Sequence, residues 1–77
     1  MNNFDAVFTV VQKHCSNQET ILGVGQLEKI AAEAGIKIDR LYFYLESLSN
    51  MGLLHYSYND KKVSLTDEGK KTTFVFP

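Results

Sequence analysis

His14 and Cys15 are the one adjacent pair in this chain whose side chains could support nucleophilic chemistry, because an imidazole can deprotonate a thiol. In a helix, neighbouring side chains point about 100° apart, and no third group stands at a spacing that would orient this pair. Cys15 is also the only cysteine, which excludes an intramolecular disulfide. We therefore expect Cys15 to pack in the core, as most free cysteines do.

Other patterns that carry chemistry are missing from the sequence. His55 stands in a β-prone segment with no acidic residue at a spacing that would orient it. The chain has no glycine-rich phosphate loop, no metal-ligand spacing and no pair of carboxylates placed for acid–base catalysis. We expect a protein that is not an enzyme and that needs neither a cofactor nor a metal.

Charge and length limit the partners and the size of the fold. Eight basic and nine acidic residues give a net charge of −1, so any nucleic-acid binding would need a local cationic patch. The 77 residues, 44% of them hydrophobic, predict a single domain over residues 1–77. The N-terminus does not resemble a signal peptide, and no apolar run is long enough for a membrane span. We expect a cytoplasmic protein that does not bind a membrane.

Hydrophobic periodicity predicts three helices in the first fifty residues. The first helix has apolar side chains at Phe4, Val7, Phe8, Val11 and Cys15. The segment Ile21-Leu22-Gly23-Val24-Gly25 could form a brief strand followed by a helix entry, with Gly25 as the cap. A second helix would follow over Gln26–Ala34, and Gly35 would end it. For the third helix we expect Asp39 as the N-cap, an apolar stripe at Leu41, Leu45 and Leu48, an end near Asn50 and Gly52 as the stop.

From Leu53 the period changes to two, which predicts a β-hairpin. Leu54, Tyr56 and Tyr58 alternate with polar residues, as do Val63 and Leu65. Asn59-Asp60 separates the two runs, and both residues tolerate the positive φ of a tight turn. Thr66 would cap a short helical turn through Asp67 and Glu68, and the segment 72–77 is prone to form a short C-terminal strand. The order, three helices followed by a hairpin, predicts an α+β fold.

The packing residues, helix stops and turn residues of this pattern resemble the winged-helix domain, and in particular small regulators of the multiple-antibiotic-resistance repressor type. The resemblance covers residues 27–70 and is carried by Ile30, Ala31, Gly35-Ile36, Leu41, Leu45, Leu48, Gly52-Leu53-Leu54 and Leu65-Thr66-Asp67-Glu68-Gly69. It implies a three-helix bundle with a C-terminal hairpin wing, in which a brief strand precedes the second helix.

The resemblance also implies double-stranded DNA as the partner, with the third helix in the major groove and the wing on the backbone. Carried over to this chain, the candidate DNA-binding residues are Lys37, Arg40, Tyr42, Phe43, Ser47, Lys61 and Lys62. Arg40 could contact a guanine or a phosphate, and Tyr42 could donate a hydrogen bond to a phosphate or touch a thymine methyl group. The wing lysines suit phosphate contacts, although polar residues are also usual in a solvated turn.

A second interpretation follows from the composition of the same surface. The expected reading helix and wing together carry four cations and three anions, which leaves a net charge of only +1 for phosphate contacts. The cations are Lys37, Arg40, Lys61 and Lys62, and the anions are Asp39, Glu46 and Asp60. Tyr42 and Phe43 are aromatic residues of the kind that anchors protein interfaces. The alternative is therefore a protein–protein interaction module without DNA binding. In either case we expect a homodimer or a protein partner, with the first helix and Phe74-Val75-Phe76 as the available dimer surfaces.

Overall fold

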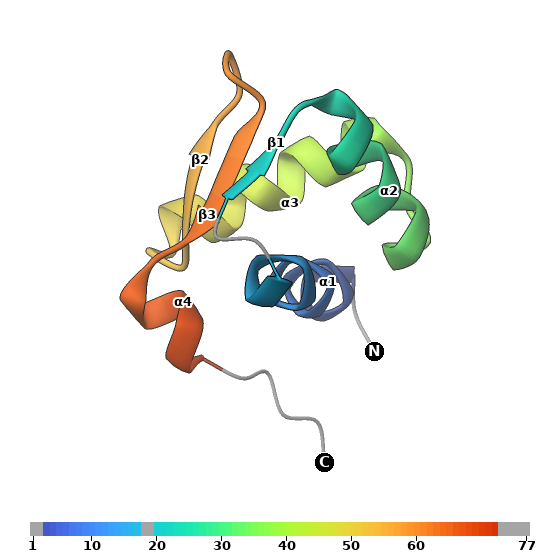
Figure 1. The fold of residues 1–77 in the computed structure, drawn as a ribbon. Coiled ribbons are helices and arrows are strands. Elements are labelled where there is room, and N and C mark those ends of the chain that lie inside the picture. The colour runs from blue at the N-terminus through green and yellow to red at the C-terminus, as the bar shows by residue number, and fades with distance from the viewer. Residues whose placement is uncertain (1–2, 18–19, 73–77) are drawn as a thin grey trace.

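The computed structural model describes residues 3–17 and 20–72, and it has the α+β fold and the winged-helix layout that the sequence predicts (Figure 1). Three helices form one layer, and a small antiparallel sheet packs against them, with the hairpin loop beside the connection from β1 to α2. The elements in chain order are α1 (Asn3–Asn17), β1 (Thr20–Leu22), α2 (Val24–Ala34), α3 (Ile38–Asn50), β2 (Leu54–Ser57), β3 (Lys62–Leu65) and α4 (Asp67–Lys71).

The sheet has the strand order β1-β3-β2, so β3 lies in the centre. β2 and β3 form the expected hairpin, with Leu54 opposite Leu65 and Ser57 opposite Lys62. β1 adds to the other edge of β3, with Ile21 opposite Val63. The brief strand that the sequence predicts is therefore the third member of the sheet.

The core lies between the sheet and the helices, and its members follow the predicted stripes. Helices α1, α2 and α3 and strands β1 and β3 each contribute at least one fully buried side chain. The central residues are Val7, Phe8 and Val11 of α1, Ile21 of β1, Leu27 and Ile30 of α2, Leu41, Leu45 and Leu48 of α3, and Val63 of β3. The expectation that Cys15 packs in the core is met only in part, because its side chain packs against the core but remains partly exposed.

The second helix begins two residues earlier than predicted. Val24 is its first residue and Gly23 is its N-cap, whereas the sequence pattern suggests Gly25 for the entry. Gly23 has φ +95°, and its N–H donates to the Lys61 carbonyl at 2.9 Å. This positive φ favours glycine, so the tight turn falls at Gly23, directly after the strand.

The third helix also begins earlier than predicted, with Lys37 rather than Asp39 at the N-cap. The Lys37 carbonyl accepts the hydrogen bond from the Leu41 N–H at 3.0 Å, and Asp39 lies in the first helical turn. An acidic residue is favourable both at an N-cap and in the first turn, so its type alone does not fix the first residue of the helix. The predicted stops are confirmed, since Gly35 and Gly52 both have the left-handed φ typical of a helix end.

The hairpin turn differs from the one expected at Asn59-Asp60. The loop spans residues 58–61, and its positive φ falls on Lys61, at +51°. The Lys61 N–H closes the turn on the Tyr58 carbonyl at 3.3 Å. A four-residue loop does not require a positive φ at both central positions, as a two-residue hairpin turn does.

The last described helix, α4, is fixed to the rest of the domain by the predicted cap at Thr66. The Thr66 hydroxyl accepts a hydrogen bond from the Gly69 N–H at 2.9 Å and donates one to the Gly52 carbonyl at 2.7 Å. The Gln12 amide of α1 donates to the carbonyl oxygens of Gly69 and Thr72 at 3.0 and 2.7 Å. The predicted C-terminal strand, and with it the Phe74-Val75-Phe76 dimer surface, lies outside the described residues.

Across residues 3–17 and 20–72, none of the helices combines the length and the apolar character that crossing a bilayer requires.

Candidate nucleic-acid interface

Helix α3 presents one face to the core and one to the exterior, as the spacing of its leucines predicts. Leu41, Leu45 and Leu48 are fully buried. The exposed residues of the helix are Asp39, Arg40, Phe43, Glu46 and Asn50, and Ser47 is partly exposed beside them. Of the sequence-predicted contacts, Arg40, Phe43 and Ser47 therefore lie on the outer side of α3, where a ligand can reach them.

The charges on this outer side nearly cancel. Arg40 is exposed together with Asp39 and Glu46, and the exposed Lys37 stands at the N-terminal end of the helix. Neither Lys37 nor Arg40 has an ion pair within residues 3–17 and 20–72, so both cations are available to a ligand. The positive end of the helix dipole lies at the same place, which further favours an anion near Lys37.

Tyr42 does not lie on the open outer face with Phe43. It is partly buried and packs edge-to-face on Tyr58 of the hairpin loop, with ring centroids 5.2 Å apart and planes at 84°. Since Tyr58 comes from the turn, this contact joins the wing tip to the middle of α3. No local pattern indicates this pairing, because the two residues belong to different elements.

The two wing lysines have different environments. The Lys61 ammonium lies 3.4 Å from the centroid of the Tyr58 ring and 5.3 Å from that of Tyr42, and it donates a hydrogen bond to the Tyr58 carbonyl at 2.7 Å. Lys62 is exposed, and its side chain makes no hydrogen bond or ion pair with any described residue. Of the two cations expected to contact phosphates, the structure leaves Lys62 free and engages Lys61.

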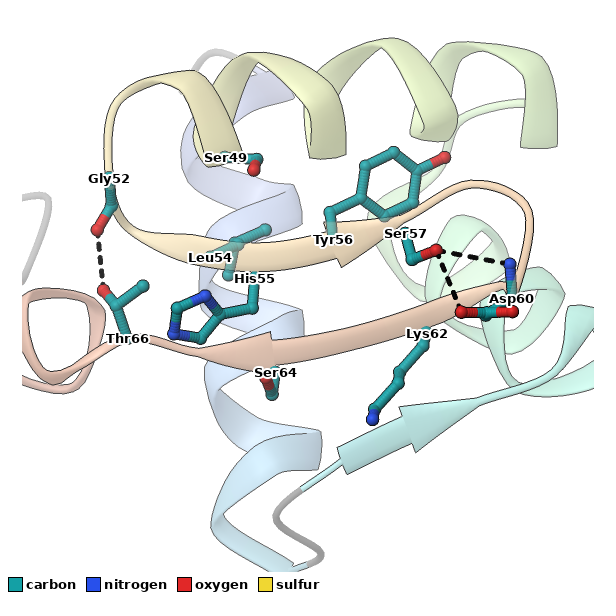
Figure 2. A pocket seen from close by; sticks show the side chains of 10 residues that line it. All are labelled: Ser49, Gly52, Leu54, His55, Tyr56, Ser57, Asp60, Lys62, Ser64 and Thr66. Carbon is teal, nitrogen blue, oxygen red and sulfur yellow. Dashed lines mark hydrogen bonds between the residues drawn. The ribbon is translucent and has the colours of Figure 1, made fainter.

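Tyr56 of β2 directs its ring toward α3 (Figure 2). Its hydroxyl oxygen is buried and has no hydrogen-bond partner among residues 3–17 and 20–72. Burial raises the pKa of Tyr56 to about 12, and the neighbouring Tyr42, Tyr58 and Glu46 add to the shift. An ionised Tyr56 therefore costs more in the folded protein than in the unfolded chain.

We expect the substitution Tyr56→Phe to leave stability unchanged or to raise it by about 1 kcal/mol at pH 7, because it removes a buried hydroxyl without a partner. The pKa of Tyr56 in the folded state lies above its ordinary value near 10. The wild-type protein therefore keeps its neutral-pH stability below about pH 10 and loses part of it as the pH rises toward about 12, because the unfolded chain then ionises Tyr56 more easily. Urea denaturation at pH 7, 10 and 11 checks both points, with a smaller alkaline loss in the variant. A variant that is less stable at pH 7 would show that the hydroxyl does have a partner.

The outer flank of α3 also carries exposed apolar surface. Phe43 is 56% exposed, and Met51, just after the helix, is 57% exposed. The Phe43 ring touches that of Tyr44, which packs edge-to-face on Phe4 of α1 at 4.9 Å. Phe43 is thus the exposed end of an aromatic row that begins at α1, and it faces a different neighbour from Tyr42.

An open groove of about 680 Å³ runs along β2 and the end of α3 (Figure 2). It is open to solvent, and polar residues such as His55, Ser57, Lys62 and Ser64 stand among its lining residues beside Leu54. Ser57 and Asp60 are joined within it by hydrogen bonds of 3.3 and 3.4 Å, which hold the turn. Sites for small molecules usually enclose most of the ligand with apolar walls, and this groove does not.

His14 and Cys15 have different surroundings in the structure. His14 contacts the Glu33 carboxylate of α2 at 3.1 Å, on the exposed side of the two helices. Burial raises the pKa of the Cys15 thiol, which disfavours the thiolate form needed for nucleophilic attack. Within the part of the chain that the structure describes, no three His, Cys, Asp or Glu side chains are grouped to hold a metal ion.

No known protein family matches this chain, and no curated protein is significantly similar to it in sequence.

Proposed function

We propose that this protein binds double-stranded DNA as a small transcriptional regulator similar to the multiple-antibiotic-resistance repressor type. In this proposal, α3 enters the major groove and the wing contacts the backbone. The observation that carries it is the contact of Tyr42 with Tyr58, which joins the hairpin tip to α3. Because α3 and the wing are already fixed to each other, binding to a duplex does not lose the conformational entropy of ordering the wing.

Arg40, Phe43 and Ser47 are the candidate base contacts, since they lie on the outer side of α3. Arg40 is suited to guanine, and the Phe43 ring is suited to a thymine methyl group. Lys37 at the start of α3 and Lys62 on the wing are the candidate phosphate contacts.

The electrostatic contribution should be small. Three free cations, Lys37, Arg40 and Lys62, are accompanied by the exposed acids Asp39, Glu46 and Asp60. The two phosphate contacts, from Lys37 and Lys62, would give a slope of about −2 for the logarithm of the binding constant against the logarithm of salt concentration. A single copy should therefore bind weakly, and a homodimer on two half-sites would provide the missing affinity.

Fluorescence polarisation with a pool of random duplexes at about 50 mM salt tests the proposal, because phosphate contacts are strongest at low salt. We expect binding with a salt slope of about −2 per copy or shallower. Arg40→Ala should weaken it about tenfold, which corresponds to about 1.4 kcal/mol. Lys13→Ala, which removes an exposed cation from α1, is the matched control and should have little effect. Absence of binding to any duplex would refute the proposal.

The second candidate function is a protein-interaction module, and the exposure of Phe43 favours it. An aromatic side chain more than half exposed on an open helix face is typical of an interface anchor. This candidate predicts that Phe43→Ala abolishes association with a partner or with a second copy while the fold is kept. Sedimentation measures the association state of the wild-type protein and of the Phe43→Ala variant. Identical association states would argue against the protein-interaction module.

A further inference from the structure

The two adjacent wing lysines differ so strongly in their surroundings that they cannot have the same role in DNA binding. This difference concerns the wing of the proposed DNA-binding surface, and the inference below rests on that proposed function.

Lys61 is held at both its backbone and its side chain. Its carbonyl accepts the hydrogen bond from Gly23 at the end of β1, and its N–H closes the turn on Tyr58. Its ammonium lies over the Tyr58 ring and donates to the Tyr58 carbonyl, with the Tyr42 ring on a further side. A cation over an aromatic face is attracted by the ring quadrupole, and here two rings from different elements share one ammonium.

These contacts connect three parts of the chain at one point. Tyr58 belongs to the turn, Tyr42 to α3, and Gly23 to the connection between β1 and α2. The Tyr42 and Tyr58 rings also touch each other at 5.2 Å. The Lys61 side chain therefore fastens the wing tip to the reading helix and is not extended toward solvent.

Lys62 has none of these contacts. It lies in β3 opposite Ser57 of β2 and Leu22 of β1, and its side chain is exposed. Because β3 is the central strand, its backbone position is fixed from both sides.

We infer that Lys61 is a positioning residue that sets the wing against α3, and that Lys62 alone supplies the wing's contact with a DNA phosphate. A phosphate contact contributes about 0.9 to the salt slope, whereas a positioning residue contributes to affinity at every salt concentration alike. The two lysines are thus separable by the salt dependence of binding.

The variants Lys61→Met and Lys62→Met remove one charge each and keep the length of the side chain. Lys62→Met should make the salt slope shallower by about 0.9 and leave the melting temperature unchanged. Lys61→Met should weaken binding about threefold or more at each salt concentration, with an unchanged slope and a lower melting temperature. Lys61→Arg should keep the wild-type affinity and melting temperature, because a guanidinium also binds an aromatic face. Methionine and arginine meet the same positive φ as lysine, so the backbone cost is matched.

A measurement without DNA tests the positioning role separately. In the NMR spectrum, the protons next to the Lys61 ammonium should be shifted upfield from those of the other lysines by the Tyr58 ring. The substitution Tyr58→Leu should remove the shift. An ordinary Lys61 resonance, or equal slope changes for the two methionine variants, would overturn the inference. If the wild-type protein binds no duplex, the proposed function fails, and the Lys61 resonance still decides whether the side chain is held.

Discussion

Replacing Gly69 with alanine is expected to lower the free energy of unfolding by about 2–3 kcal/mol, the cost of overfilling a packed site. A Cβ atom at this position would overlap the backbone oxygen of Leu53 and crowd the Leu65 side chain at 3.2 Å. The Leu53 carbonyl also accepts a hydrogen bond from the Thr66 N–H at 3.2 Å, so it cannot move away without breaking that bond. A domain of this size has a total stability of roughly 4–12 kcal/mol, and the loss is a large part of it.

Gly25→Ala is the matched control for this prediction. Gly25 lies in the first turn of α2, and a Cβ atom there would meet nothing within 4 Å. Because its φ is not positive, alanine should be tolerated and should stabilise the helix by about 0.5 kcal/mol. Thermal and urea denaturation followed by circular dichroism measure both variants. Equal stability of the two would mean that α4 does not pack on Leu53 in solution.

Leu45→Ala is expected to be still more destabilising, by about 3–5 kcal/mol, because it leaves a cavity at the centre of α3. The Leu45 side chain is fully buried between Leu41 and Leu48 on the core face of the helix. Such a loss is a large part of the total stability of the domain, so the variant should unfold at a much lower urea concentration than the wild type.

The same substitution at an exposed leucine provides the comparison for Leu45. Leu22 is 59% exposed on β1, and Leu22→Ala should cost less than about 1 kcal/mol. Dispersion of the methyl signals in one-dimensional NMR spectra, together with urea denaturation, distinguishes the two variants. A well-folded Leu45→Ala protein with nearly wild-type stability would contradict the core position of α3.

The sequence was sufficient for the features that depend on local pattern. The spacing of Leu41, Leu45 and Leu48 placed the core face of α3, and with it the exposure of Arg40 and Phe43. Thr66 was identified as an N-cap because its hydroxyl bonds an N–H only three residues away. These are periodicities and short-range hydrogen bonds, which a linear pattern records directly.

The features that could not be predicted depend on contacts between distant residues or on details of a turn. The sequence pattern predicts Tyr42 on the DNA-facing surface with Phe43, because nothing in its neighbourhood indicates the approach of Tyr58 from the hairpin. The pairing of His14 with Glu33 across two helices had no sequence signal either. The first residues of α2 and α3 were misplaced because glycine and aspartate are acceptable at several neighbouring positions of a helix start.

The pairing of β1 with β3 has a consequence for how the chain folds. Ile21 meets Val63 only after a loop that contains the whole of α2 and α3 has closed. The entropy of this closure must be overcome before the sheet gains its third strand, so the helices can form early while β1 joins late. We therefore expect the rate of folding to depend more on the meeting of β1 with β3 than on the local helical segments.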